Sequence, residues 1–104
     1  MKSTEHLSVM GDFTLPKDLI VIHPNDGYDL GVLERETPVR IFVCKDRQEF
    51  LAGKARTLPG TLRLENSCTQ STVRMNLTWW QEMGKPKDVT VALEGETLLI
   101  TRGR

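Results

Sequence analysis

The residues best suited to chemistry are two cysteines and two histidines. A nucleophilic site would need Cys44 or Cys68 beside a histidine base, and nothing in the spacing brings either cysteine to His6 or His23. Cys44 ends a stretch of alternating apolar residues, and Cys68 lies in a segment rich in serine and threonine. This pattern indicates one half-buried thiol and one exposed thiol rather than a catalytic nucleophile.

The segment His23-Pro24-Asn25-Asp26-Gly27 places a histidine close to the carboxylates of Asp26 and Asp29. Such a group would suit a metal site or an acid–base pair in a small enzyme or ligand-binding barrel. The same residues are typical of a tight turn, because proline presets φ and glycine accepts positive φ. Neither a glycine-rich phosphate loop nor an HExxH or GxSxG motif is present. We therefore predict a turn here, and a protein with no metal, no cofactor and no enzymatic activity.

Basic residues are the most useful functional lead. Arg40, Arg63 and Arg74 alternate with apolar residues, so each should project from the solvent side of a strand. A second group surrounds a predicted helix and its loop and consists of Lys45, Arg47, Lys54 and Arg56. Arginine at such places suits phosphate contacts and bidentate recognition of guanine. The predicted DNA-binding residues are Arg40, Arg47, Lys54, Arg56, Arg63 and Arg74.

The charge balance limits how these residues could act. Fourteen lysines and arginines are matched by fourteen aspartates and glutamates, giving zero formal net charge. Zero net charge argues against a protein that coats nucleic acid by bulk electrostatics, but it is compatible with a local basic patch.

The elements that must position these residues are short strands, and residues 72–102 form the most complete unit. Alternating apolar residues predict a strand that stops at Thr78, which with Gln81 forms a capping box for a short helix. Residues 89–100 then predict a hairpin that turns at Glu94-Gly95-Glu96.

Two adjacent tryptophans lie on that predicted helix. Side chains at neighbouring helix positions point about 100° apart, so Trp79 and Trp80 cannot face the same way. We expect Trp80 and Met83 in the core. Either tryptophan could anchor a partner, so both are candidate interface residues.

The first two thirds of the chain adds further short elements. The pattern predicts two short strands or one bulged strand in residues 7–15, a buried strand at 19–22, a partner strand at 28–33 and a strand at 39–43. It then predicts a helix capped by Asp46 and Glu49 that turns Phe50 and Leu51 inward, a basic loop at 54–60 with Pro59-Gly60 as internal boundary, and a strand from Leu62. The whole indicates a mainly β (α+β) protein, a small β-barrel of short strands with two short helices. We predict a single domain, residues 1–104, with half-repeats at 7–53 and 61–104.

Composition sets the class and compartment. The 104 residues are 38% apolar and 27% charged, which is typical of a soluble globular protein. No apolar run is long enough to span a bilayer, and the two cysteines have no CxxC partner. A cytoplasmic protein with no membrane association is the prediction.

The order of parts resembles the swapped-hairpin β-barrel of the AbrB, MazE and MraZ families. Their half-unit has an arginine-bearing strand, a short "LP-x-x-(W/L)" helix, an "LG-x-x-x-x-D-x-V" link and a closing hairpin. The corresponding stretch here is Arg74-Met75-Asn76-Leu77-Thr78-Trp79-Trp80-Gln81-Glu82-Met83-Gly84-Lys85-Pro86-Lys87-Asp88-Val89-Thr90-Val91. Thr78 stands where proline is usual, and the link from Gly84 to Asp88 is one residue short. The resemblance covers about a third of the chain.

A second stretch, residues 11–19, is similar to the opening "G-R-x-x-L-P-K-x-L" of the same families, and it supports a tandem swapped-hairpin arrangement. Here Asp12 replaces the arginine that would contact DNA. Within the terminal unit, Arg74 is the residue that matches the DNA-contacting arginines of those families.

The resemblance implies a DNA-binding transcriptional regulator that contacts double-stranded DNA through strand and loop arginines and forms a homodimer or higher oligomer. The alternative is a small β-barrel protein-interaction module or accessory factor, related to a phage or a toxin–antitoxin system, that binds a protein partner and no DNA. Zero net charge and Asp12 favour the alternative, and both hypotheses stay open at this point.

Overall fold

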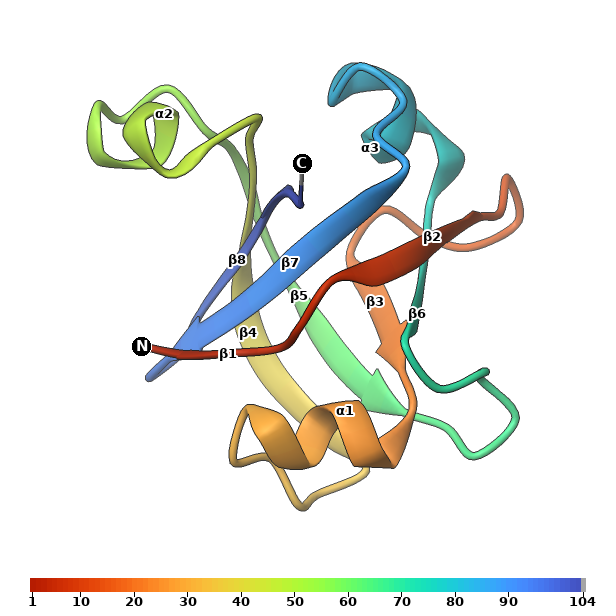
Figure 1. The fold of residues 1–104 in the computed structure, drawn as a ribbon. Helices are drawn as coiled ribbons and strands as arrows, with labels where there is room; N and C mark the ends of the chain where they lie inside the picture. Colours follow the sequence, from red (N-terminus) through yellow and green to blue (C-terminus); the bar gives the residue numbers. More distant parts are fainter. Residues whose placement is uncertain (104) are drawn as a thin grey trace.

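The computed structural model describes residues 1–103. Within this range the chain forms eight strands and three short helices (Figure 1). In chain order they are β1 (Lys2–Ser3), β2 (Leu7–Gly11), β3 (Leu19–Ile22), α1 (Pro24–Asp29), β4 (Glu36–Val43), α2 (Arg47–Leu51), β5 (Arg56–Leu64), β6 (Thr72–Met75), α3 (Leu77–Glu82), β7 (Asp88–Glu94) and β8 (Thr97–Arg102).

Seven of these strands close into a barrel. The order around it is β7-β2-β6-β3-β5-β4-β8, and the antiparallel β7–β8 pair completes the ring. β1 pairs with β7 beside β2, so Lys2 lies opposite Leu93. Closure leaves few unpaired strand edges, which are the usual sites of unwanted association. The predicted mainly β barrel is confirmed, although it carries three short helices where two were predicted.

The barrel is built from two corresponding halves. β2-β3-α1-β4 and β5-β6-α3-β7 share the order strand, strand, helix, strand. The parallel pair β2–β6 corresponds to the parallel pair β5–β3, and the antiparallel pair β2–β7 corresponds to β5–β4. The half-repeats at 7–53 and 61–104, and a swapped-hairpin origin for them, stay predictions.

Alternate residues of the strands fill the barrel interior. Fully buried examples are Ile20, Ile22, Ile41, Leu62, Val73, Met75, Val89, Val91, Leu98 and Ile100. The helices lie at the ends: α1 at one end, and α2 and α3 together at the other, where β8 finishes (Figure 1). This division decides which polar residues meet at each end.

The prediction of a turn at His23 and a strand at 28–33 is wrong, because these residues form α1 and the link after it. Pro24 is at the start of the helix, where its missing N–H costs nothing, and His23 is the N-cap whose Nδ1 accepts from the Asn25 N–H at 3.0 Å. Gly31, with φ of 75°, follows the helix. The residue types that favour a turn also favour a helix start, and here the helix prevails.

Pro59-Gly60 is not a boundary but lies inside β5. β5 pairs with β3 only from Thr61 onward, so Pro59 occupies a stretch paired on one side, where proline is tolerated. A Cβ at Gly60 would collide with the carbonyl oxygen of Asp18, so glycine permits this close approach. The predicted loop 54–60 therefore becomes strand from Arg56.

Two local predictions differ in detail near the helices. Asn76, not Thr78, caps α3: its Oδ1 accepts from the Thr78 N–H at 2.8 Å, and its Nδ2 donates to the Leu15 carbonyl at 2.7 Å. The Asp46–Glu49 cap of α2 is confirmed, with the Glu49 N–H donating to Asp46 at 2.9 Å. The predicted inward position of Leu51 is wrong, because this side chain is 73% exposed. The predicted hairpin at 89–100 is confirmed as β7 and β8.

Candidate nucleic-acid interface

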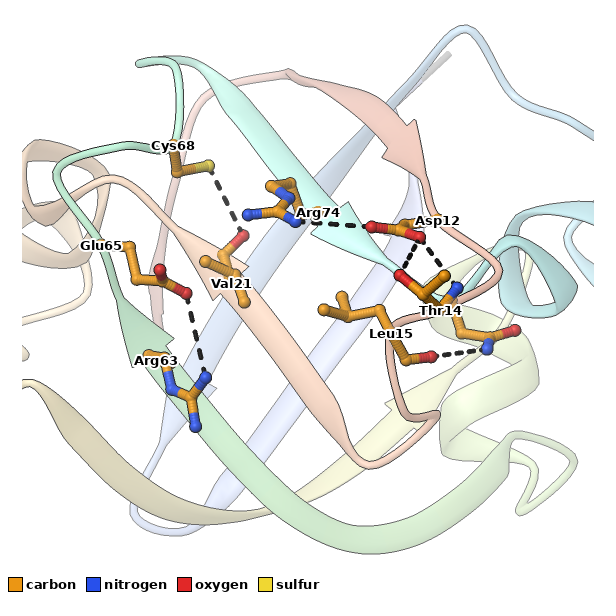
Figure 2. Close-up of polar contacts among 9 residues, drawn as sticks. Asp12, Thr14, Leu15, Val21, Arg63, Glu65, Cys68 and Arg74 are labelled. Carbon is orange, nitrogen blue, oxygen red and sulfur yellow. Dashed lines mark hydrogen bonds and ion pairs between the residues drawn. The ribbon is translucent and has the colours of Figure 1, made fainter.

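Arg74, the residue matched to the DNA-contacting arginines, faces a carboxylate of its own chain (Figure 2). Its Nη2 lies 3.4 Å from Oδ2 of Asp12. The Thr14 N–H and hydroxyl hold the other oxygen of Asp12 at 2.8 and 2.6 Å. These hydrogen bonds, and then Arg74, lower the pKa of Asp12 below its ordinary value, so the carboxylate stays charged. A phosphate approaching Arg74 would meet this negative charge.

Arg63 is engaged in the same way on the outer face of β5. Its Nη2 and Nε lie 2.8 and 2.9 Å from Oε2 of Glu36, and its Nη1 lies 3.9 Å from Oε2 of Glu65. Ion pairs this exposed contribute little to stability. They do place two carboxylates where a phosphate would have to bind.

The other four predicted residues are exposed and have no ion pair within 4.0 Å in the part of the chain that the structure describes: Arg40, Arg47, Lys54 and Arg56. Arg47 lies on α2, and Lys54 and Arg56 follow it into β5. Arg40 lies three residues before the end of β4, which puts it roughly 10 Å along the strand from the end where the other three residues lie. The structure therefore gathers three of the six residues and leaves Arg40 at a distance.

A cavity of about 240 Å³ opens between α2 and α3 beside these residues. Lys45, Lys54 and Arg56 line it together with two acidic residues, Glu49 and Glu82. Its remaining lining is the apolar group Val43, Cys44 and Met83. Two predicted DNA-binding residues thus share one hollow with a third cation, Lys45.

The topology brings more cations to this end of the barrel, because β4 and β8 finish where β5 and β7 begin (Figure 1). We call it the basic end, and its members are Lys45, Arg47, Lys54, Arg56, Lys85, Lys87 and Arg102. The Arg102 N–H donates to the Lys45 carbonyl at 3.2 Å. A Cβ at Gly84 would lie 3.8 Å from Nη1 of Arg102, so that guanidinium reaches the end of α3.

Acidic residues gather at the opposite end of the barrel, around α1, the start of β4 and the β7–β8 turn. The members of this acidic end are Asp26, Asp29, Glu34, Glu36, Glu65, Glu94 and Glu96. Arg35 is an exposed cation there without an ion pair in residues 1–103. The separation of charge is partial, because Asp46, Glu49, Glu82 and Asp88 also lie at the basic end and Arg63 lies at the acidic end. Zero net charge therefore conceals two ends whose excess charges have opposite sign. The sequence groups Lys45 with Arg47, Lys54 and Arg56, but the predicted DNA-binding residues do not include Lys45. The prediction also omits Lys85, Lys87 and Arg102, which only the strand directions bring to this end.

The tryptophans are arranged opposite to the prediction. Trp79, with 5% of its surface exposed, packs in the core with Met83, and its Nε1 donates to the Lys17 carbonyl at 2.8 Å. Trp80 is only half-buried, and its Nε1 donates to the Pro86 carbonyl at 2.8 Å. The helix begins at Leu77, before the predicted cap Thr78, and the pair turned to the core is Trp79 and Met83, which are four residues apart on one face. The proposed interface roles of both residues stay predictions.

Both cysteines are buried free thiols, so the prediction that one is exposed is wrong. Burial raises the pKa of Cys44 to about 11 and raises the pKa of Cys68 as well. Cys68 belongs to the loop that joins β5 to β6, and its Sγ lies 3.5 Å from the Thr72 carbonyl oxygen. Thiols that are protonated at neutral pH are weak nucleophiles.

The remaining candidate acidic group has a structural role. Asp26 is buried in α1, and its Oδ2 accepts from the Ser71 N–H at 2.9 Å, which ties the helix to the β5–β6 loop. Among residues 1–103, no three or more histidine, cysteine, aspartate or glutamate side chains are grouped as a metal site requires.

Comparisons with protein-family models, with curated proteins and with solved structures give no match to this chain. Fold and charge therefore define its class: a small closed β-barrel with a basic end and an acidic end. In the described part of the chain, none of the helices has the length and apolar character needed to cross a membrane.

Proposed function

We propose that the protein is a non-enzymatic, cytoplasmic DNA-binding regulator of the AbrB and MraZ type that contacts double-stranded DNA through its basic end. The observation that carries this proposal is the gathering of Lys45, Arg47, Lys54 and Arg56 around α2, without ion pairs to neighbouring carboxylates in residues 1–103. Arg63 and Arg74 are each paired with a carboxylate, so their contact with DNA, like that of Arg40, stays a prediction outside the observation that carries the proposal.

The physical basis is the negative charge of the duplex. Lysine and arginine that neutralise phosphates release counterions, so affinity falls as salt rises. If the basic end contacts about five phosphates, affinity for duplex should fall roughly 500-fold between 50 and 200 mM salt. The acidic end, repelled by the phosphates, orients the barrel with α2 toward the DNA.

The test is fluorescence anisotropy with a labelled random duplex over this range of salt. Arg47→Ala and Lys54→Ala should each weaken binding and reduce the slope of log affinity against log salt by about 0.9. Arg35→Ala removes an equally exposed cation from the acidic end and should leave binding unchanged. An equal loss of duplex affinity in all three variants would overturn the assignment of DNA binding to the basic end.

The alternative is a protein-interaction module, favoured by two exposed apolar side chains beside the Arg74–Asp12 pair. Met10 is 49% exposed and Phe13 is 76% exposed, and both lie in or just after β2. Large apolar residues left in water often mark a contact with another protein. Absence of duplex binding even at low salt would select this function. Self-association into a homodimer or higher oligomer is expected under the first proposal, and light scattering after size exclusion measures it.

A further inference from the structure

We propose that the cavity between α2 and α3 is a binding site for a single phosphate group, held by Lys45, Lys54 and Arg56. The inference rests on the proposed function in one respect: the phosphate group considered first is one in the DNA backbone. The same chemistry would accept free phosphate, and the experiment below separates the two sources.

Strand alternation directs two of the three cations toward the cavity. Val43 of β4 and Leu58 of β5 belong to the rows of side chains that pack in the barrel core. Lys45 and Arg56 continue those rows by two residues, just past the last apolar position, and Arg56 lies opposite Val43 in the β4–β5 register. Their charged groups therefore converge at the barrel end rather than spreading over its outer surface.

The third cation comes from the turn after α2. The Lys54 N–H donates to the Glu49 carbonyl at 2.9 Å, and the Gly53 N–H donates to the Phe50 carbonyl at 3.1 Å. These bonds fix the chain that carries Lys54 against the end of the helix. Arg47, on the same helix, is not part of the cavity lining. The site is thus distinct from the rest of the basic end.

The two carboxylates of the lining, Glu49 and Glu82, offset only part of the charge of the three cations. Oε1 of Glu49 accepts from the Lys45 N–H at 2.8 Å and so secures the start of α2. Among residues 1–103, neither Glu49 nor Glu82 forms an ion pair within 4.0 Å of the three cations. The lining keeps an excess of positive charge, and Glu82 lowers its affinity for anions without abolishing it.

Size and lining restrict the ligand to a small anion. At about 240 Å³ the cavity is smaller than the roughly 300–1,000 Å³ of pockets that enclose drug-sized molecules. A tetrahedral oxyanion with a few waters, each about 30 Å³, fits this space. Val43, Cys44 and Met83 form an apolar wall beside the three cations. Arginine supplies the planar pair of donors that phosphate oxygens accept.

The experiment is a titration of the full-length protein with inorganic phosphate at constant ionic strength, followed by amide NMR. The amide chemical-shift changes should concentrate in residues 43–56 and 82–83. Arg56→Ala and Lys54→Ala should each weaken phosphate binding roughly tenfold or more, and Arg56→Lys should weaken it less because charge is kept. Glu82→Gln should strengthen binding a few-fold.

Arg47→Ala is the matched control, since it removes a cation from α2 outside the cavity. Phosphate binding should be unchanged in this variant, whereas duplex binding should weaken. No shifts at 50 mM phosphate, or equal phosphate affinity in wild type and Arg56→Ala, would overturn the site. If Arg56→Ala is unfolded, an unchanged affinity in Glu82→Gln and in Lys54→Ala would do the same.

A competition experiment with duplex DNA distinguishes a backbone phosphate from free phosphate. It also distinguishes failure of the cavity site from failure of the proposed DNA binding. Duplex DNA should displace inorganic phosphate if the cavity takes a backbone phosphate. Phosphate binding that duplex leaves unaffected would assign the cavity to free phosphate and contradict only the backbone source. Duplex binding with the expected salt dependence but without phosphate binding would overturn the cavity alone, and phosphate binding without any duplex binding would overturn the proposed function alone.

Discussion

The two tryptophans should differ sharply in their contribution to stability. Trp79 is 5% exposed in the core, and its indole N–H bonds the Lys17 carbonyl, so Trp79→Ala removes both packing and a hydrogen bond. Large-to-small changes of buried aromatic residues cost about 3–5 kcal/mol. Trp80 is half-buried, and its hydrogen bond to Pro86 spans only a local turn, so Trp80→Ala should cost about 1–2 kcal/mol.

Urea unfolding followed by far-UV circular dichroism measures both values without relying on the removed fluorophore. The chain has two tryptophans, so each conservative variant also isolates the emission of the other. Emission of Trp80→Phe should come from the buried Trp79, lie at shorter wavelength and resist quenching by iodide. A larger loss of stability in Trp80→Ala than in Trp79→Ala would refute the assignment of the core face of α3.

Three further outcomes follow from the structure. Gly60→Ala should destabilise the fold by about 1–3 kcal/mol, measured by urea unfolding, because the new Cβ meets the Asp18 carbonyl; a neutral effect would show that β5 does not approach Asp18 this closely. Cys44 has a folded-state pKa of about 11 against an ordinary 9.0, so its protonated thiol should contribute stability that is complete below pH 9 and is lost as pH rises toward 11. Between pH 7 and 10.5 the free energy of unfolding should fall more steeply with pH for wild type than for Cys44→Ala. The same pH dependence in both proteins would contradict the burial of this thiol. Asp12 has a lowered pKa, so its contribution to stability should be present above its ordinary pKa of 3.8 and be lost as pH falls below it; carboxyl NMR gives the midpoint, and an ordinary or raised value would refute the Thr14 and Arg74 contacts.

The parts that the sequence predicted correctly depend on neighbouring residues. The Asp46–Glu49 cap and the β7–β8 hairpin are local patterns, in which each residue finds its partner a few positions away. The same local rules could not separate a turn from a helix start at Pro24, because both conformations use the same φ and the same residue types.

The parts that were missed depend on partners distant in sequence. Asn76 caps α3 while its amide also reaches the Leu15 carbonyl, 61 residues away. Asp12 and Arg74, 62 residues apart, meet because β2 and β6 run parallel in register. The basic end forms from four separate segments, and their shared location follows from strand direction rather than from any motif.

The central claim, that one end of the barrel binds duplex DNA, is tested most directly by two charge-reversal variants with the same change in net charge. Arg47→Glu combined with Lys54→Glu alters the basic end. Lys2→Glu combined with Arg35→Glu alters the acidic end, where Lys2 lies opposite Leu93 and next to Glu94. Anisotropy with a random duplex at 50 mM salt should show binding abolished in the first variant and retained in the second. Equal binding by the two variants, or no binding by the wild-type protein, would contradict the account.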